Sequence, residues 1–528
     1  MASDIGFRPQ LRLHPLSWIF SLTRYLRQFI VPLGAFVLFG ARDNGQLWGL
    51  LLIVPLVIGA LWQQWIYRYG FGPRGLVIQE GLFFRNVRQI EYARIENIDV
   101  ERGVLHRLLG VAQVSIATST GGKAEASIRV LSLPAVQALR ERIFSQAHSD
   151  SRAETRTAGH AEEVLLHLAP GELIRYGLID NRGLWIVAAV LGFLSQEGLW
   201  QVVGATLARW FTDSTLQQLV VLGLAVQVAV ALAAILVLIA ALRVFSIVGA
   251  LITLFDFTLT RHEHDFRVRH GLLTRVALNL RVRRIQSVHQ TQTLLHRLFD
   301  RVSLRVDLAG DSSSQERKQE SSHVRTRWLA PLCSPQQAGQ LIAAALPDAH
   351  LDTEPAWQPL APHARGRLFR RTVYVWTVLG LLALLILGIL PQAPVQPDWR
   401  ILLFYIPVLA AVAWVRAHLY VKNTRWALTP DALLFRHGWP TRRLSVLPRN
   451  RLQSVQLSSS PFDQHYDMAN VTIDTAGAGS MHDRVHIRLL AAQTAAELAR
   501  ALYRSRVAAP PGALRPSFAT NSEQDSIP

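Results

Sequence analysis

One segment of this chain occurs three times. The stretch GLFFRNVRQIEYARIENI starts at Gly81, and it returns as GLLTRVALNLRVRRIQSV from Gly271 and as GWPTRRLSVLPRNRLQSV from Gly438. The spacing holds without a gap, because positions in the first copy match positions 190 and 357 residues later. A fixed internal spacing is the signature of a repeated structural unit. The sequence therefore predicts three copies of one domain.

Each copy is preceded by a pair of apolar segments. Half of all residues are hydrophobic, 17% are charged and the mean hydropathy is +0.21, a balance typical of membrane proteins. Most of these segments approach the ~20 residues that cross a bilayer. The first is short, and its alternative is a buried or interfacial helix. Residues 244–255 are expected to continue the fourth span out of the membrane. The six predicted spans are residues 29–41, 47–65, 184–200, 216–242, 373–390 and 401–415.

The placement of basic residues indicates which side of the membrane the repeats occupy. The connectors 42–46, 195–215 and 391–400 hold only three of the 55 lysines and arginines. Basic residues concentrate on the cytoplasmic side of membrane proteins. We therefore expect both termini and all three repeats to be cytoplasmic. No cleavable signal peptide is visible in the first 28 residues.

Short β-like segments replace the long apolar runs inside each copy. In the second copy, DFRVRHGLL alternates apolar and polar residues and meets a turn at Gly271, as expected for a hairpin. Further strands are expected at SVHQTQ and RVSLRVDLA, and each copy ends in an amphipathic helix that starts near Leu133, Ser334 or Ala491. Strands closed by one C-terminal helix describe a small barrel or curled sheet, which is the layout of a pleckstrin-homology-like (PH-like) domain.

The motif order resembles a known family over residues 20–505. A hairpin, a strand pair around Gly81, then RIENI or RIQSV and LHRLLG or LHRLF is similar to the bacterial PH-domain membrane proteins, the membrane-flanked, YdbS/YdbT-like family. The third copy departs from it, with SPFDQHYDMANV in place of the LHRL run. The resemblance implies a bacterial inner-membrane location, a smaller one-domain PH-like membrane protein as a partner, and a role in envelope stress or antimicrobial-peptide resistance.

The expected fold class is an α+β membrane protein with six transmembrane helices in three hairpins, each followed by a cytoplasmic PH-like β-barrel or curled sheet with a C-terminal helix. We expect a scaffold that binds lipid headgroups or partner proteins. The expected boundaries are residues 1–66 for the N-terminal segment and first hairpin, 67–150 for the first PH-like domain, 151–182 for a linker, 183–255 for the second hairpin, 256–348 for the second domain, 349–371 for a linker, 372–417 for the third hairpin, 418–507 for the third domain and 508–528 for a disordered tail.

Arginines recur at two positions of the repeat. One set stands near the repeated glycine and the other stands nine residues later. The planar guanidinium of arginine binds a phosphate or carboxylate at two points, which makes both sets candidate headgroup contacts. The alternative is structural: an ion pair or strand-edge arginine for the later set, and a solvated face for the earlier one. These residues are Arg85, Arg94, Arg275, Arg284, Arg442 and Arg451.

The repeated glycines have a backbone explanation. A hairpin turn requires positive φ, which glycine adopts without steric cost. We expect this conformation at Gly81, Gly271 and Gly438.

Other classes of function find less support. The net charge of +18 fits the cytoplasmic flanks of a six-span protein, so we expect anionic lipids and no nucleic acid as partners. His262, His264 and His270 lie close in sequence, but no cysteine completes a metal-ligand set around them. Cys333 is the only cysteine and follows no nucleophile motif, so no catalytic residue and no cofactor are expected. A component of a transport or export system for peptide or lipid is the alternative, although the spans carry no charge at mid-depth.

Overall fold

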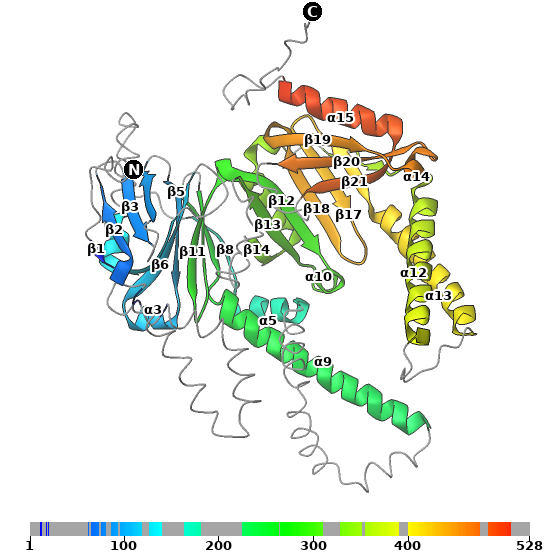
Figure 1. Cartoon of the computed structure of the whole chain (residues 1–528), viewed down its shortest axis with the longest axis horizontal. Helices are drawn as coiled ribbons and strands as arrows, with labels where there is room; N and C mark the ends of the chain where they lie inside the picture. Colours follow the sequence, from blue (N-terminus) through cyan, green and yellow to red (C-terminus); the bar gives the residue numbers. More distant parts are fainter. Residues whose placement is uncertain are drawn as a thin grey trace, which may run out of the picture. The chain divides into compact units, whose positions relative to one another are not determined.

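Figure 1 shows the chain as a computed structural model. The structure describes residues 67–80, 86–118, 126–139, 163–180, 224–309, 328–350, 354–389, 400–475 and 484–507, with gaps at 73–74, 93–94 and 263–264, and a few isolated residues before residue 67. The chain divides into two compact units, each with its own core. The first holds Met1–Ile285, Gln292–Arg305 and Gly310–Leu341, and the second holds Gln286–Thr291, Val306–Ala309 and Ile342–Pro528.

The first repeat forms strands on two sides of one core. The sixth strand reads VAQVSIAT, and this alternation sends Ala112, Val114 and Ile116 inward, where each is 0% exposed. They pack against Leu76 and Leu139 from other elements. The sheet that precedes them has the strand order β1-β2-β3-β4. The elements are β1 (Leu11–Arg12), β2 (Arg68–Phe71), β3 (Gly75–Glu80), β4 (Asn86–Glu91), β5 (Ile95–Arg102), α3 (Val104–Leu108), β6 (Val111–Thr118) and β7 (Ala126–Ser132).

The end of the first repeat shares a sheet with the beginning of the second. This sheet has the order β7-β6-β5-β11-β10-β9-β8. Strand β5 pairs antiparallel with β11, and Val100 lies opposite Ala277. Hydrogen bonding therefore runs without a break from one repeat into the next. The added strands are β8 (Glu163–His167), β9 (Thr258–His262), β10 (Asp265–His270) and β11 (Arg275–Arg281).

A long apolar helix, α9 (Leu224–Leu254), leads into the second repeat. Among the described residues, one helical segment, Leu236–Leu254, is long and apolar enough to cross a membrane by length and composition. Helix α5 (Pro170–Ile179) packs on α9, and Arg243 donates a hydrogen bond to the carbonyl oxygen of Leu178 at 2.9 Å. The helix thus continues past Arg243, as the sequence predicted. The segment expected to be a linker, residues 151–182, contains β8 and α5.

The second repeat ends in the predicted amphipathic helix. Ser334 accepts a hydrogen bond from the backbone N–H of Gln337 at 3.2 Å, and the Gln337 side chain accepts one from the Ser334 N–H at 3.1 Å. This reciprocal cap explains why the Ser-Pro sequence starts a helix. The elements are η2 (Val282–Arg284), β12 (Ile285–Gln292), α10 (Leu294–Leu298), β13 (Val302–Leu308), β14 (Trp328–Cys333) and α11 (Pro335–Ala345).

The second unit repeats the arrangement of the first. Strand β12 lies next to β18, and the order continues β18-β17-β16-β15. A second sheet, β19-β20-β21, packs against α15, which lies across it in Figure 1. The elements are η4 (Pro347–Ala349), β15 (Gln358–Pro359), α12 (Ala364–Ile389), α13 (Arg400–Asn423), β16 (Arg425–Leu428), β17 (Ala432–His437), β18 (Arg442–Pro448), η5 (Arg449–Arg451), β19 (Leu452–Ser458), α14 (Pro461–Gln464), β20 (Met468–Thr475), β21 (Val485–Ala491) and α15 (Ala492–Val507).

The predicted spans are described only in part. Helices α12 and α13 contain the fifth and sixth, and they pack closely where the ring of Tyr405 meets Gly380. The spans 29–41, 47–65 and 184–200 lie wholly or almost wholly outside the described residues, as do residues 216–223 of the fourth. Six transmembrane helices therefore stay a prediction.

The backbone conformation of a turn glycine can be tested by its effect on stability. Gly271 has φ +110°, and a Cβ there would overlap the carbonyl oxygen of Thr274. We expect Gly271→Ala to destabilise the protein by at least about 1–2 kcal/mol. Gly339→Ala is the control, because a Cβ at this position of α11 meets nothing within 4 Å, and alanine favours a helix by up to about 1 kcal/mol. In thermal unfolding in detergent, the midpoint temperature should fall for Gly271→Ala and rise for Gly339→Ala. Equal shifts of the two midpoints would contradict the turn assignment.

Candidate functional site

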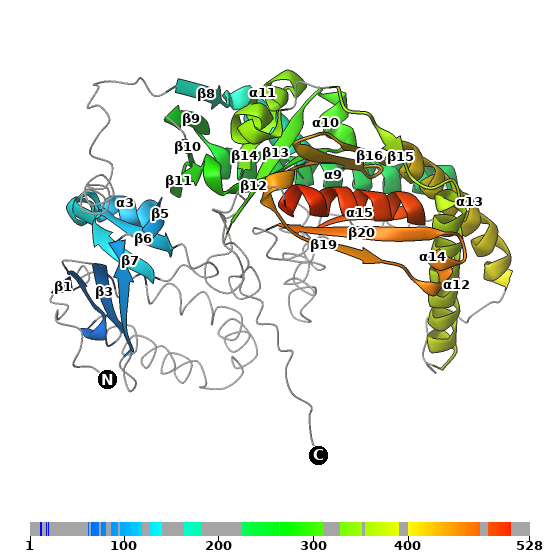
Figure 2. The same ribbon diagram turned by 90° about the horizontal axis from the view of Figure 1, so that it is seen from above.

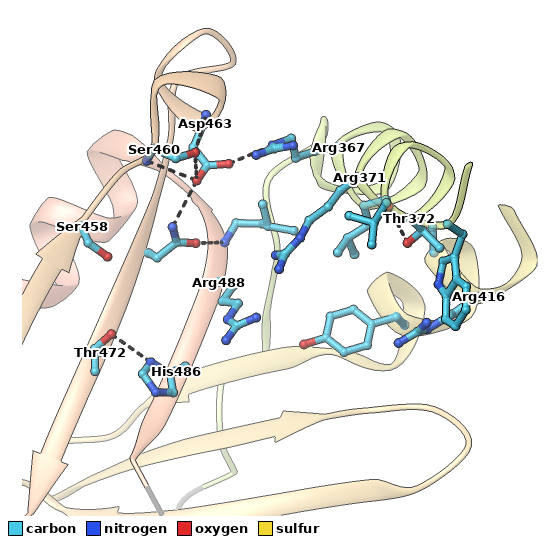
Figure 3. Close-up of a pocket in the computed structure, with 17 residues that line it drawn as sticks. Arg367, Arg371, Thr372, Arg416, Ser458, Ser460, Asp463, Thr472, His486 and Arg488 are labelled. Carbon is cyan, nitrogen blue, oxygen red and sulfur yellow. Dashed lines mark hydrogen bonds and ion pairs between the residues drawn. The ribbon is translucent and has the colours of Figure 1, made fainter. Parts of the chain in front are cut away.

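A basic pocket lies in the second unit between helices α12 and α13 and the sheet β19-β20-β21 (Figure 3). Its volume is about 770 Å³, within the range of pockets that hold small-molecule ligands. Four of the lining residues are arginines and one is an aspartate, so the wall has a net positive charge. The charged lining residues are Arg367, Arg371, Arg416, Arg488 and Asp463.

Asp463 fixes one corner of this pocket. Its carboxylate accepts hydrogen bonds from the Ser460 hydroxyl at 2.6 Å, from Arg367 Nε at 3.0 Å and from Asn470 Nδ2 at 3.2 Å. Burial by itself would raise the pKa of Asp463, but the hydrogen bonds from Ser460, Arg367 and Asn470 outweigh it and lower the pKa below its usual value. Asp463 is therefore ionised at neutral pH and neutralises Arg367.

The aspartate of this corner is present in the third repeat and not at the equivalent positions of the other two. The position of Asp463 holds His106 in the first copy and His296 in the second, at the repeat spacing. It lies in α14, the segment where the third copy departs from the LHRL run. Burial lowers the pKa of His296 to about 4, so this equivalent position carries no charge at neutral pH. The departure in sequence thus introduces an anionic anchor for an arginine of α12.

The other three arginines of the pocket have no counter-ion among the described residues. Arg371, Arg416 and Arg488 form no hydrogen bond or ion pair with the part of the chain that the structure describes. In Figure 3, Arg371 and Arg488 extend into the pocket from α12 and β21, and Arg416 approaches from α13. Guanidinium groups that converge without an acidic partner are suited to bind an anion such as a phosphate.

Exposed aromatic side chains lie close in sequence to the pocket arginines on both helices, and one of them, Trp376, lines the pocket. Tyr374 and Trp376 follow Arg371 on α12 and are 72% and 48% exposed, and Trp414 precedes Arg416 on α13 and is 53% exposed. Beyond them both helices present exposed leucine, valine and isoleucine side chains. Tyrosine and tryptophan are enriched where a membrane protein passes from lipid to water. The arginines therefore lie close in sequence to exposed aromatic residues on both helices, with exposed apolar side chains beyond them.

A family comparison agrees with the repeats. The family model of the bacterial PH domain matches the chain three times, over residues 24–147, 215–332 and 369–506. The chain belongs to the bacterial PH-domain family. It is 21% identical over 496 residues to the UPF0699 transmembrane protein YdbT of Bacillus subtilis (strain 168), covering 89% of this chain and 93% of the relative. No solved structure matches the chain. The resemblance inferred from the motifs is thus confirmed.

The four repeated arginines that the structure describes, Arg275, Arg284, Arg442 and Arg451, do not line the pocket. Arg451 donates a hydrogen bond to Asp348 at 2.6 Å, and this bond lowers the pKa of that carboxyl despite partial burial. Arg275 and Arg442 begin β11 and β18, and Arg284 ends η2. Arg85 and Arg94, together with Gly81, lie outside the described residues. Binding by the repeated set stays a prediction, and the pocket uses other arginines of the same chain.

Three polar side chains in the second unit resemble a catalytic set. His289 lies 2.7 Å from Asp307 and 2.8 Å from the hydroxyl of Ser445. Ser445 is only 4% exposed in the interior strand β18, and it does not line the pocket. A substrate cannot reach this hydroxyl in the described arrangement. The network instead links β12, β13 and β18, so it fastens two PH domains through their shared sheet. Among the described residues, no cluster of three or more His, Cys, Asp or Glu side chains could hold a metal ion.

Two equivalent serines test this fastening role. Ser287 is 2% exposed and donates a hydrogen bond to Asp307 at 2.8 Å, whereas Ser454, at the same repeat position in β19, is exposed. We expect Ser287→Ala to lower the free energy of unfolding by about 1.5–3 kcal/mol, because it removes one of the two hydrogen bonds that the Asp307 carboxylate shares with Ser287 and His289. Ser454→Ala should change it by less than about 0.5 kcal/mol. Equal effects in thermal unfolding would show that the network does not stabilise the joint.

Proposed function

We propose that this chain is a multi-pass protein of a bacterial inner membrane that presents three PH domains at the cytoplasmic leaflet and holds an anionic lipid headgroup in the pocket of the third. It acts as a membrane scaffold for lipids or partner proteins, with no catalytic step of its own. The observation that carries the proposal is the convergence of Arg371, Arg416 and Arg488 in one pocket beside an apolar hairpin that carries exposed aromatic residues.

The membrane location has three supports. The similar protein YdbT is named a transmembrane protein, and the similarity covers most of both chains. Segment Leu236–Leu254 has the length and composition of a span. Helices α12 and α13 expose apolar side chains beyond their aromatic residues, which favours contact with lipid. The excess of basic residues outside the short connectors supports the cytoplasmic orientation.

The charge of the pocket favours an anionic headgroup over a neutral one. Each basic side chain near a membrane surface contributes about 1 kcal/mol of attraction to anionic lipid. A hydrogen bond between guanidinium and phosphate adds direction to this attraction. The PH fold does not by itself establish lipid binding, so the proposal depends on these side chains.

Binding measurements on the full-length protein in nanodiscs of phosphatidylcholine test the proposal. Short-chain phosphatidylglycerol, short-chain phosphatidylcholine and inorganic phosphate are added separately. We expect saturable binding of phosphatidylglycerol and at least about 10-fold weaker binding of phosphatidylcholine, which corresponds to about 1.4 kcal/mol. Tight binding of phosphate would indicate a soluble anion as the ligand. Equal binding of the two lipids would contradict headgroup recognition by charge.

A further inference from the structure

The shared sheets follow one rule from repeat to repeat. In the first unit, β5 of the first repeat pairs with β11, the fourth sheet strand of the second repeat, and Val100 lies opposite Ala277. In the second unit, β12 is the repeat equivalent of β5, and it lies next to β18, the equivalent of β11. The hydrogen bond between His289 and Ser445 spans this second joint. In both joints, the fifth strand of one repeat (β5 or β12) therefore lies next to the fourth strand of the following repeat (β11 or β18).

Two strands are left without this counterpart in the described residues. Strand β19 is the third copy of β5 and β12, and it stands at the end of its sheet order, β19-β20-β21. Strand β4 is the first copy of β11 and β18, and it stands at the end of β1-β2-β3-β4. Figure 2 shows β19 along the rim of its sheet. Within the described residues, the rule therefore leaves one edge of each kind unpaired, that of β19 and that of β4.

The side chains of β19 are those of an interior strand. It reads LQSVQLS and contains no charged residue and no proline, the features that normally protect an exposed edge from pairing. Its equivalent β12 buries Ser287 and Val288 at 2% and 0% exposure, whereas the matching Ser454 and Val455 of β19 are exposed and partly exposed. Leu457 of β19 is 48% exposed. An uncharged edge with an exposed leucine is suited to receive another strand.

The register of the pairing between β5 and β11 identifies the strand that could pair with β19. Leu457 is the repeat equivalent of Val100, and Val87 of β4 is the equivalent of Ala277. Because Val100 lies opposite Ala277, the same pairing would place Leu457 opposite Val87. Val87 is itself 36% exposed. Both edges thus present an apolar side chain at the matching position.

We propose that β19 of one molecule pairs antiparallel with β4 of a second copy of this chain. The contact joins different surfaces of the two molecules, so it generates a head-to-tail assembly that closes as a ring or grows as a row. It continues across molecules the joint that connects repeats inside one chain. The proposal is independent of lipid binding in the pocket.

Site-directed disulfides test the pairing in the full-length protein. On a Cys333→Ala background, chains with Val87→Cys and chains with Leu457→Cys carry different tags and are co-expressed in one membrane. Facing residues of an antiparallel pair lie within reach of a disulfide. We expect a dimer that contains both tags after mild oxidation. Leu457→Cys is replaced by Gln456→Cys in the register control, which should give less than about one tenth of this product because its side chain points to the other face.

A charge at the edge provides the second measurement. Leu457→Lys should reduce the assembled fraction in mass photometry of detergent-solubilised protein by about 10-fold or more, because an edge lysine opposes strand addition. Tyr503→Lys is the matched control, since Tyr503 is 64% exposed on α15 and is not part of strand β19. A protein that is monomeric in the membrane and in detergent would overturn the proposal. So would a Leu457→Cys crosslink to a different protein only, or, in a chain that carries both new cysteines, a disulfide that forms only within that chain.

Discussion

Replacement of Arg371 and Arg488 by alanine together is expected to weaken binding of an anionic phospholipid headgroup by about 100-fold or more. A hydrogen bond to a charged group contributes about 1.5–3 kcal/mol, and about 1.4 kcal/mol corresponds to a factor of ten in affinity. Loss of two such contacts therefore exceeds two powers of ten. Both side chains point into the pocket from different elements, so the effect requires that one ligand contacts them at once. Titration of short-chain phosphatidylglycerol into the nanodisc-bound protein measures the change.

A control with the same loss of charge separates recognition from general attraction. Arg365 and Arg370 are exposed on α12 and do not line the pocket. Their replacement by alanine removes two positive charges near the same membrane surface. We expect a change in affinity of less than about 10-fold, because exposed charges are screened by salt. If both double variants lose the same affinity, the pocket is not the binding site.

The second large effect concerns stability. Asp463→Ala should lower the free energy of unfolding by about 1.5–3 kcal/mol, because it removes charge-assisted hydrogen bonds to a buried carboxylate whose partner Arg367 is partly exposed. Asp463 is 6% exposed, and its loss leaves Arg367 and Asn470 without their acceptor and removes a cap of α14. Chemical unfolding in detergent, followed by tryptophan fluorescence, measures the change. Asp467→Ala is the control, because Asp467 is exposed in the same segment. Its φ of +50° is unfavourable for alanine, so we expect this variant to cost about 1 kcal/mol.

The pH dependence of the same group has a defined sign. The pKa of Asp463 is lower in the folded protein than its ordinary value, so its contribution to stability is complete above the unfolded pKa of about 4. It is lost as the pH falls through the lower, folded pKa. The difference in stability between wild type and Asp463→Asn should therefore shrink in acid below about pH 4. A difference that grows in acid would contradict the assigned hydrogen bonds.

The repeat predicted much of the fold because turns and apolar alternation are local. The hairpin at Gly271 and the helix that follows Ser334 formed where the sequence placed them. The pairing of β5 with β11 was not predicted, because spacing within a repeat does not say which strand of another repeat meets a given edge. Helix α5 was also not predicted. It has ten residues and lies in the segment before an apolar run, and that segment was interpreted as a linker to a membrane span.

The pocket was harder to predict than the fold. The repeated arginines were predicted as headgroup contacts because they recur, yet one of them, Arg451, forms an ion pair with Asp348 on η4. Arg371 and Arg416 are not among the six repeated arginines, so the repeat did not single them out. The useful signal was the departure of the third copy at SPFDQHYDMANV, which introduces Asp463. Repetition marks what all copies need for folding, and a departure from it marks what one copy does alone.

Native mass spectrometry of the full-length protein, released from bacterial membranes into mild detergent, tests the central claim most directly. The account predicts that an anionic phospholipid is retained by the wild type and by the Arg365→Ala/Arg370→Ala variant. The Arg371→Ala/Arg488→Ala variant should lose it. Retention of the same lipid by all three proteins, or of none by the wild type, would contradict a headgroup site in the third PH domain.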